Sequence, residues 1–141
     1  MKRVFLDVNV FFDYLKGREP FYYAAWEVIT LAVHKDIVCG VSPNCFPHAF
    51  HEMKKDYPDW NDLKHRYAML RKVVDCGILD GTLIDTALST AKPNDLEDAI
   101  ILRMAEAWGA DYLLTRDKRG FPESTMRILT PKEFLSEWEA K

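Results

Sequence analysis

Residues 3–17 read RVFLDVNVFFDYLKG, a short apolar run that ends in an aspartate and continues with helical spacing. The apolar run up to Leu6 is typical of a buried β-strand. After Asp7, apolar side chains recur three and four residues apart until Gly17, so we expect a helix that ends at this glycine. A strand that leads into a helix is the unit from which α/β proteins are built.

The same alternation continues along the rest of the chain. We expect further strands at residues 37–42, 76–79, 112–115 and 126–129, and helices near residues 20–32, 45–55, 63–74, 82–90 and 95–105. Thr130-Pro131-Lys132-Glu133 has the form of a capping box that opens a last helix. The pattern predicts an α/β domain with a mostly parallel sheet and helices on both of its faces.

Length and composition limit the classes of protein that this chain can be. The 141 residues fit one domain (1–141), and 48% of them are hydrophobic, enough to form a core. No stretch approaches the ~18 consecutive apolar residues of a membrane helix. The first apolar run meets Asp7 too early for a signal peptide, so we expect a cytoplasmic protein. The three cysteines form no CxxC pair, which argues against a disulfide framework or a thiolate zinc site.

Three aspartates lie where the functional crevice of a parallel sheet is found. Asp7 follows the first strand, Asp117 follows the strand at 112–115, and Asp98 lies in the first turn of the helix at 95–105. In open α/β sheets the crevice lies outside the carboxyl ends of the strands, so these acids would share one rim. Carboxylates suit Mg²⁺ or Mn²⁺, which can activate water and offset charge on a phosphate.

Each of these acids also has a purely structural interpretation, which the spacing leaves open. Asp7 can cap the helix that follows it, and Asp98 can complement the dipole of its helix. Asp117 can start a turn. The formal charge of −3 counts against nonspecific nucleic-acid binding, but it is compatible with a carboxylate site that a cation neutralises.

Four segments of the chain resemble motifs of the PIN domain family, in the same order. Residues 4–13 resemble its opening hhhDxN pattern, and residues 95–100 its D-x-E-D-A segment; residues 110–121 and 129–135 are similar to its last two motifs. The resemblance implies a Rossmann-like α/β/α sandwich and an Mg²⁺- or Mn²⁺-dependent ribonuclease. Compact members of the family resemble VapC toxins, which a cognate antitoxin neutralises and which are often homodimers.

The resemblance also implies roles for individual residues. Asp7, Asp98 and Asp117 match the metal ligands of the family, and two polar residues match positions that orient the site, Asn9 and Thr115. Asp95 and Glu97 match acids of the helix motif whose role varies.

The sequence departs from the family pattern at two positions. A glutamate is common six residues after the serine that ends the second strand, but from Ser42 that count falls on His48. Glu52 lies one helical turn further on and shares a face with His48, so either side chain could assist the reaction. Gly120 stands where an aspartate often precedes the phenylalanine. These departures leave a second hypothesis, a catalytically impaired PIN-like domain that binds RNA or a protein.

Two other groups of residues each have a functional and a structural interpretation, and for the second group the core interpretation is the favoured one. Arg116, Lys118 and Arg119 flank Asp117 and could contact RNA phosphates or form a solvated loop. The aromatic residues between Phe11 and Tyr23 could form a patch for a partner or a second subunit, or they could fill the core.

Overall fold

The computed structural model describes residues 1–140 and contains a five-stranded parallel sheet. The strands lie in the order β3-β2-β1-β4-β5, and all four neighbouring pairs are parallel. Their bounds are Lys2–Leu6 (β1), Ile37–Val41 (β2), Val74–Cys76 (β3), Tyr112–Leu114 (β4) and Arg127–Leu129 (β5). The order reverses direction at β1, because β2 lies on one side of it and β4 on the other.

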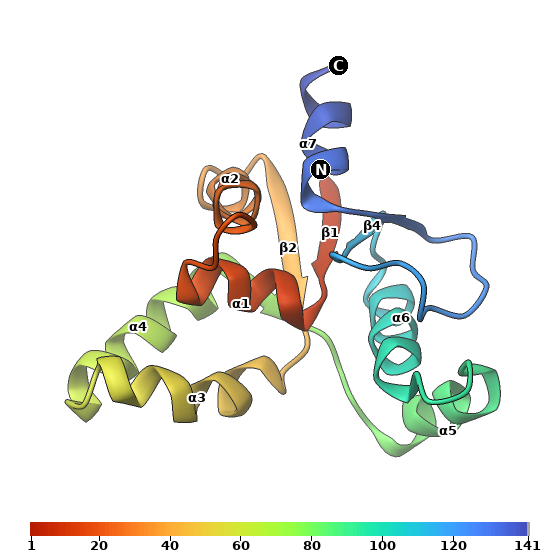
Figure 1. Cartoon of the computed structure of the whole chain (residues 1–141), viewed down its shortest axis with the longest axis horizontal. Coiled ribbons are helices and arrows are strands. Elements are labelled where there is room, and N and C mark those ends of the chain that lie inside the picture. Colours follow the sequence, from red (N-terminus) through yellow and green to blue (C-terminus); the bar gives the residue numbers. More distant parts are fainter. Residues whose placement is uncertain (141) are drawn as a thin grey trace.

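Helices cover both faces of the sheet, as the alternation of strands and helices predicts (Figure 1). Seven are present in the described part of the chain: Val8–Lys16 (α1), Tyr22–Val33 (α2), Cys45–Asp56 (α3), Trp60–Val73 (α4), Gly81–Thr90 (α5), Leu96–Trp108 (α6) and Pro131–Glu139 (α7). Alternate side chains of the strands point to opposite faces. Leu6 packs with α1 and α2, whereas Phe5 packs with α6. The fold is therefore the predicted α/β/α sandwich.

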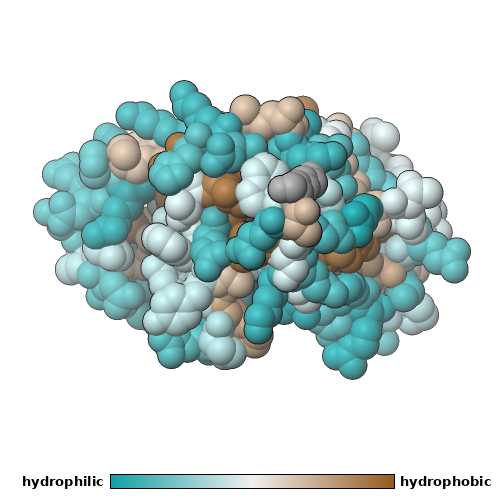
Figure 2. Space-filling model, turned by 90° about the horizontal axis from the view of Figure 1, so that it is seen from above, coloured by the Kyte–Doolittle hydropathy of each residue, from teal (hydrophilic) through white to brown (hydrophobic). Residues whose placement is uncertain are grey.

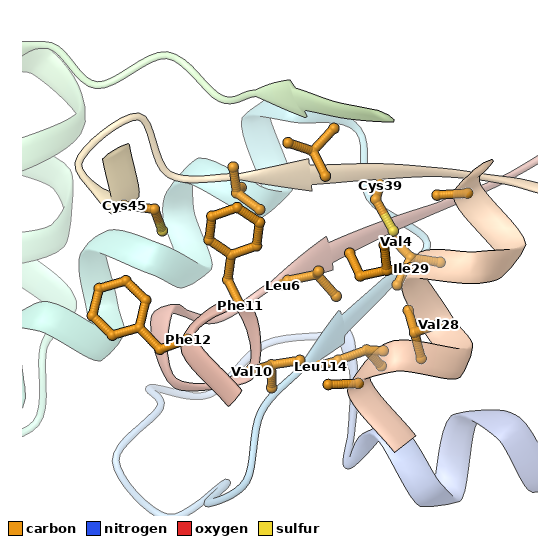
Figure 3. Close-up of a cluster of buried hydrophobic side chains, with 14 of the residues drawn as sticks. Val4, Leu6, Val10, Phe11, Phe12, Val28, Ile29, Cys39, Cys45 and Leu114 are labelled. Carbon is orange, nitrogen blue, oxygen red and sulfur yellow. The ribbon is translucent and has the colours of Figure 1, made fainter. Parts of the chain in front are cut away.

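The larger part of the core lies between the sheet, α1 and α2 (Figure 3). Val4, Leu6 and Leu114 of the strands lie in one cluster with Phe11 of α1, and all four are fully buried. Burial of such side chains is worth about 1.5–3 kcal/mol each. This packing fixes α1 against the sheet, and therefore fixes the residues at the start of α1.

Most of the expected elements are confirmed, but the third strand was placed too late. It spans Val74–Cys76 and follows α4 without a loop, whereas we expected a strand at 76–79. Val74 is buried and pairs with Cys39 of β2. This residue fits the apolar spacing of the helix before it, but its pairing with β2 makes it the first residue of the strand. Gly77 then leaves the sheet where its backbone lies against Met104 and Phe5.

The ends of two helices also follow the sequence signals. Gly17 ends α1 in the left-handed conformation, at φ +63°, which glycine adopts without strain. Thr130 and Glu133 form the reciprocal hydrogen bonds of the capping box at α7. The face that carries α7 is largely hydrophilic, with separate hydrophobic patches (Figure 2). Among residues 1–140, no helix has the length and apolar character needed to cross a membrane.

Candidate active site

An acidic pocket of about 390 Å³ lies at the carboxyl ends of β1 and β4, where the strand order reverses. The backbone N–H of Asp7 donates to the carbonyl of Leu114 (2.9 Å), so the first residue after β1 lies beside the end of β4. The pocket is lined by Asp7, Asn9, Asp95, Asp98, Asp117, Arg119 and Gly120. Segments far apart in the sequence therefore meet at one rim, the position where α/β sheets bind their ligands.

Asp7 is both the N-cap of α1 and a buried member of this pocket. One carboxylate oxygen accepts the N–H of Val8 (2.7 Å), and the other accepts the hydroxyl of Thr115 (2.8 Å). Burial raises the pKa of Asp7, although these two hydrogen bonds act in the opposite direction. The structural interpretation of Asp7 as a cap is therefore correct, and it is compatible with a role at the rim.

Asp98 lies in the first turn of α6 and is partly buried beside Gly120. A Cβ atom built on Gly120 would lie only 2.0 Å from Asp98 Oδ2. The carboxylate of Asp98 thus occupies the space that a side chain at position 120 would need. Burial, and to a lesser extent the charges of Asp7, Asp95 and other nearby acids, raise the pKa of Asp98 to about 6. A cation would relieve this unfavourable concentration of negative charge.

Asn9 supplies an unpaired polar atom at the same pocket. Its Oδ1 is buried and has no hydrogen-bond partner among the described residues. Buried polar atoms are almost always satisfied, so an orphaned oxygen in an acidic pocket is a feature that a metal ion would explain.

The carboxylate of Asp117 forms an ion pair with Arg119. Arg119 Nε and Nη2 donate to its two carboxylate oxygens (2.9 and 2.7 Å), and the backbone N–H of Arg119 adds a third contact (3.0 Å). These hydrogen bonds hold the pKa of Asp117 well below its usual range. Within residues 1–140, no three His, Cys, Asp or Glu side chains lie in positions that could hold a metal ion as they stand.

The residues nevertheless fit a hard divalent cation by their chemistry. Asp7, Asp98 and Asp117 offer only oxygen donors, and the unpaired Asn9 Oδ1 adds a neutral one. Mg²⁺ and Mn²⁺ prefer oxygen donors, and Mg²⁺ usually keeps several waters when one or two carboxylates bind it.

Four residues proposed from the sequence lie outside the pocket lining, and one of them, Thr115, hydrogen-bonds to Asp7 of the lining. Glu97 is exposed, although its charge raises the pKa values of Asp7 and Asp98. Glu52 forms an ion pair with Lys16, which lowers the pKa of Glu52. His48 is exposed and packs edge-on against Phe12 at 5.3 Å between ring centroids. Helix α3 therefore does not bring Glu52 or His48 to the acids.

The structure also reveals a buried aspartate that the sequence patterns did not single out. Asp13 of α1 is 1% exposed and forms an ion pair with Arg116 (3.1 Å). Arg116 also stacks over the ring of Phe21 at 4.3 Å. No local signal could have revealed this pair, because its two members lie at opposite ends of the chain. The pair ties the loop that carries Asp117 to α1.

A second, larger hollow lies away from the acids, among α1, α2, α3 and α4. It has a volume of about 930 Å³ and a largely apolar lining that includes Tyr14, Tyr22, Trp26, Met53, Tyr57 and Leu70. The aromatic residues near the N-terminus therefore divide between two environments. Phe11 and Phe12 fill the core, whereas Tyr14 and Tyr22 line this groove.

Comparison with known proteins supports the same family. A sequence model of the PIN domain matches residues 3–119, which is most of the chain. The structure is similar to the crystal structure of VapBC2 from Rickettsia felis bound to a DNA fragment from their promoter. The TM-score is 0.56 at 13% sequence identity, over 89% of this chain and 96% of the other. No curated protein sequence matches this chain significantly.

Proposed function

Because this chain belongs to the PIN domain family, we propose that it is a metal-dependent endoribonuclease whose active site is the acidic pocket. In this proposal Asp7, Asp98 and Asp117 hold Mg²⁺ or Mn²⁺, and RNA is the substrate. The observation that carries it is that Asp7, Asp98 and Asn9, whose Oδ1 is buried and unpaired, line one pocket. A bound cation would supply an activated water and would offset charge at the phosphodiester.

The residues around the ligands have separate tasks in this proposal. Thr115 holds Asp7 in one orientation through its hydroxyl, and the N-terminus of α1 fixes the other oxygen. Asp95 adds negative charge to the pocket and thereby favours cation binding. Glu97 contributes to the same field from the surface. We leave Glu52 and His48 out of the catalytic set, because each is engaged elsewhere.

The test is cleavage of RNA by the purified protein with Mn²⁺, with EDTA, and in the Asp98→Asn variant. We expect Mn²⁺-dependent cleavage that EDTA abolishes, and at least a hundredfold lower rate in Asp98→Asn with the fold intact by circular dichroism. Full activity of Asp98→Asn would exclude the assigned site. Amide replaces carboxylate at nearly constant volume, so a loss of activity without unfolding reports on the charge of Asp98.

We further propose a VapC-like role, in which an antitoxin polypeptide neutralises the nuclease. The fold neighbour from Rickettsia felis is a VapBC2 complex, which motivates a partner of this kind. The apolar groove among α1–α4 is a suitable surface, because exposed aromatic residues are typical of protein interfaces. Trp26 lines it and is 47% exposed.

The second candidate is a binding module that has lost catalysis. It is favoured by the absence of a ready three-ligand cluster within residues 1–140 and by the position of His48 where an acid is usual. The melting temperature separates the two candidates. A cation that binds the folded state raises it, so no increase with Mn²⁺, together with no cleavage of varied RNAs, would favour the binding module.

A further inference from the structure

Three basic residues surround Asp117 in sequence, but only one of them faces the acidic pocket. Arg116 is held by Asp13 and by the ring of Phe21, and Lys118 pairs with Glu133 at the start of α7 (2.8 Å). Arg119 alone of the three lines the pocket. Of these three basic residues, Arg119 is the one that forms an ion pair with Asp117.

The backbone around Arg119 is anchored, whereas its side chain is free to move. Lys92 donates to the backbone carbonyl of Arg119 (3.0 Å), and the Lys118–Glu133 pair holds the preceding residue. The side chain of Arg119 is 90% exposed, and that of Asp117 is 50% exposed. An exposed ion pair is weak, so separation of the two side chains costs little. If Asp117 turns, its Oδ1 also gives up the backbone N–H of Arg119 (3.0 Å).

Arg119 donates to both carboxylate oxygens of Asp117, the only side-chain atoms through which Asp117 could bind a divalent cation. The guanidinium forms a forked pair with both carboxylate oxygens. The other two proposed ligands, Asp7 and Asp98, have no such cation against them: Asp7 accepts from Thr115 and Val8, and Asp98 lies over Gly120. Asp117 is therefore the one proposed metal ligand whose carboxylate is paired with an arginine.

We propose that Arg119 is an internal counter-cation that holds Asp117 in the metal-free protein and must yield it before a divalent cation can bind. This inference rests on the proposed metal site. Arg119 is thus a positioning residue that weakens metal binding, and its removal makes the site bind metal more tightly. A purely structural role would have the opposite effect or none.

The experiment is isothermal titration of Mn²⁺ into the wild type and into Arg119→Ala. Loss of an exposed pair of this kind is expected to lower the Kd for Mn²⁺ about two- to fivefold. Arg127→Ala is the matched control, since Arg127 makes the same forked pair with Glu137 but lies outside the pocket lining. Arg127→Ala also removes one positive charge, and its Kd for Mn²⁺ should equal that of the wild type.

A third variant separates the forked pair from charge alone. Arg119→Lys keeps the positive charge but cannot grip both oxygens in a fork, so its Kd should fall between those of the wild type and Arg119→Ala. Equal Kd values in the wild type and Arg119→Ala, or equal tightening in Arg127→Ala, would overturn this role and leave the metal site standing. Absence of Mn²⁺ binding in all variants would overturn the metal site as well.

Discussion

At the scale of single residues, Gly120 determines where a carboxylate can lie. The family resemblance suggested that this glycine removes an acid from the site. In the structure the missing side chain also leaves room for Asp98, whose Oδ2 would lie 2.0 Å from an added Cβ. Asp95 Oδ1 would lie 3.1 Å from the same atom. Gly120 therefore offers no carboxylate of its own, but it leaves space for the carboxylate of Asp98.

We predict that Gly120→Ala displaces Asp98 and weakens Mn²⁺ binding about tenfold or more, the range found when groups that orient metal ligands are lost. The fold should survive, because the clashing atom is the end of a movable side chain. Titration with Mn²⁺ measures the effect. Gly81→Ala is the control, since a Cβ there meets nothing within 4 Å. Unchanged affinity in Gly120→Ala would show that Asp98 binds metal from another position or not at all.

At the scale of elements, a hydrogen bond between two side chains joins the end of β4 to the start of α1. The hydroxyl of Thr115 is fully buried and donates to Asp7, which in turn caps α1. We predict that Thr115→Val destabilises the protein by about 1–3 kcal/mol, because it leaves a buried carboxylate short of a donor. Denaturant unfolding followed by circular dichroism measures this change.

The matched control is Thr86→Val on α5. The hydroxyl of Thr86 donates to the carbonyl of Thr82 (3.1 Å), but the residue is exposed and water can replace the partner. Its effect should stay within about 0.5 kcal/mol. Similar losses in the two variants would mean that the Thr115–Asp7 bond has no special weight.

The sequence predicts elements well where periodicity or a terminal signal is strong. The run before Asp7, the glycine after α1 and the capping box of α7 all lie where expected. The third strand was misplaced because the apolar side chains that end α4 also fit a strand, and only pairing with β2 distinguishes them. A local pattern does not contain that long-range contact.

For the site, the sequence indicates which acids reach the rim but not how their side chains pair. Asp7, Asp98 and Asp117 follow from the positions of the strands and of α6, and all three line the pocket. The partners of Asp117 and Glu52 depend on side-chain orientation, which spacing does not determine. The spacing places Glu52 on the same helix face as His48, but it does not say where that face points. In the structure Glu52 pairs with Lys16 and does not line the pocket.

At the scale of the whole molecule, the acids whose pKa values are shifted fall into two groups with opposite effects on stability. Asp117, Glu52 and Glu133 are exposed, and their pairing with cations lowers their pKa values. Their contribution is present near neutral pH and is lost as the pH falls through those lowered values. Asp7 and Asp98 are at least partly buried, and their pKa values are raised.

We predict that the metal-free protein loses stability as the pH rises from about 4 to above 6, through the titration of Asp98. The folded state keeps a proton on this carboxyl up to a pKa of about 6, whereas the unfolded chain releases it near 3.8. The folded state thus binds more protons in this window, and the free energy of unfolding falls as the pH rises. Because Asp98 is only partly buried, we expect about 1 kcal/mol rather than the full value of the shift.

Unfolding in EDTA at pH 5 and pH 7 measures this loss, and Asp98→Asn should show a smaller one because its amide does not titrate. Saturating Mn²⁺ should raise the free energy of unfolding of the wild type, because the metal binds the folded state. Metal binding requires the deprotonated carboxylate and therefore grows stronger toward pH 7. The stabilisation by Mn²⁺ is then larger at pH 7 than at pH 5, and absent in Asp98→Asn. Parallel pH profiles of the two proteins in EDTA would contradict the raised pKa. An equal Mn²⁺ effect at both pH values would instead place the cation away from Asp98.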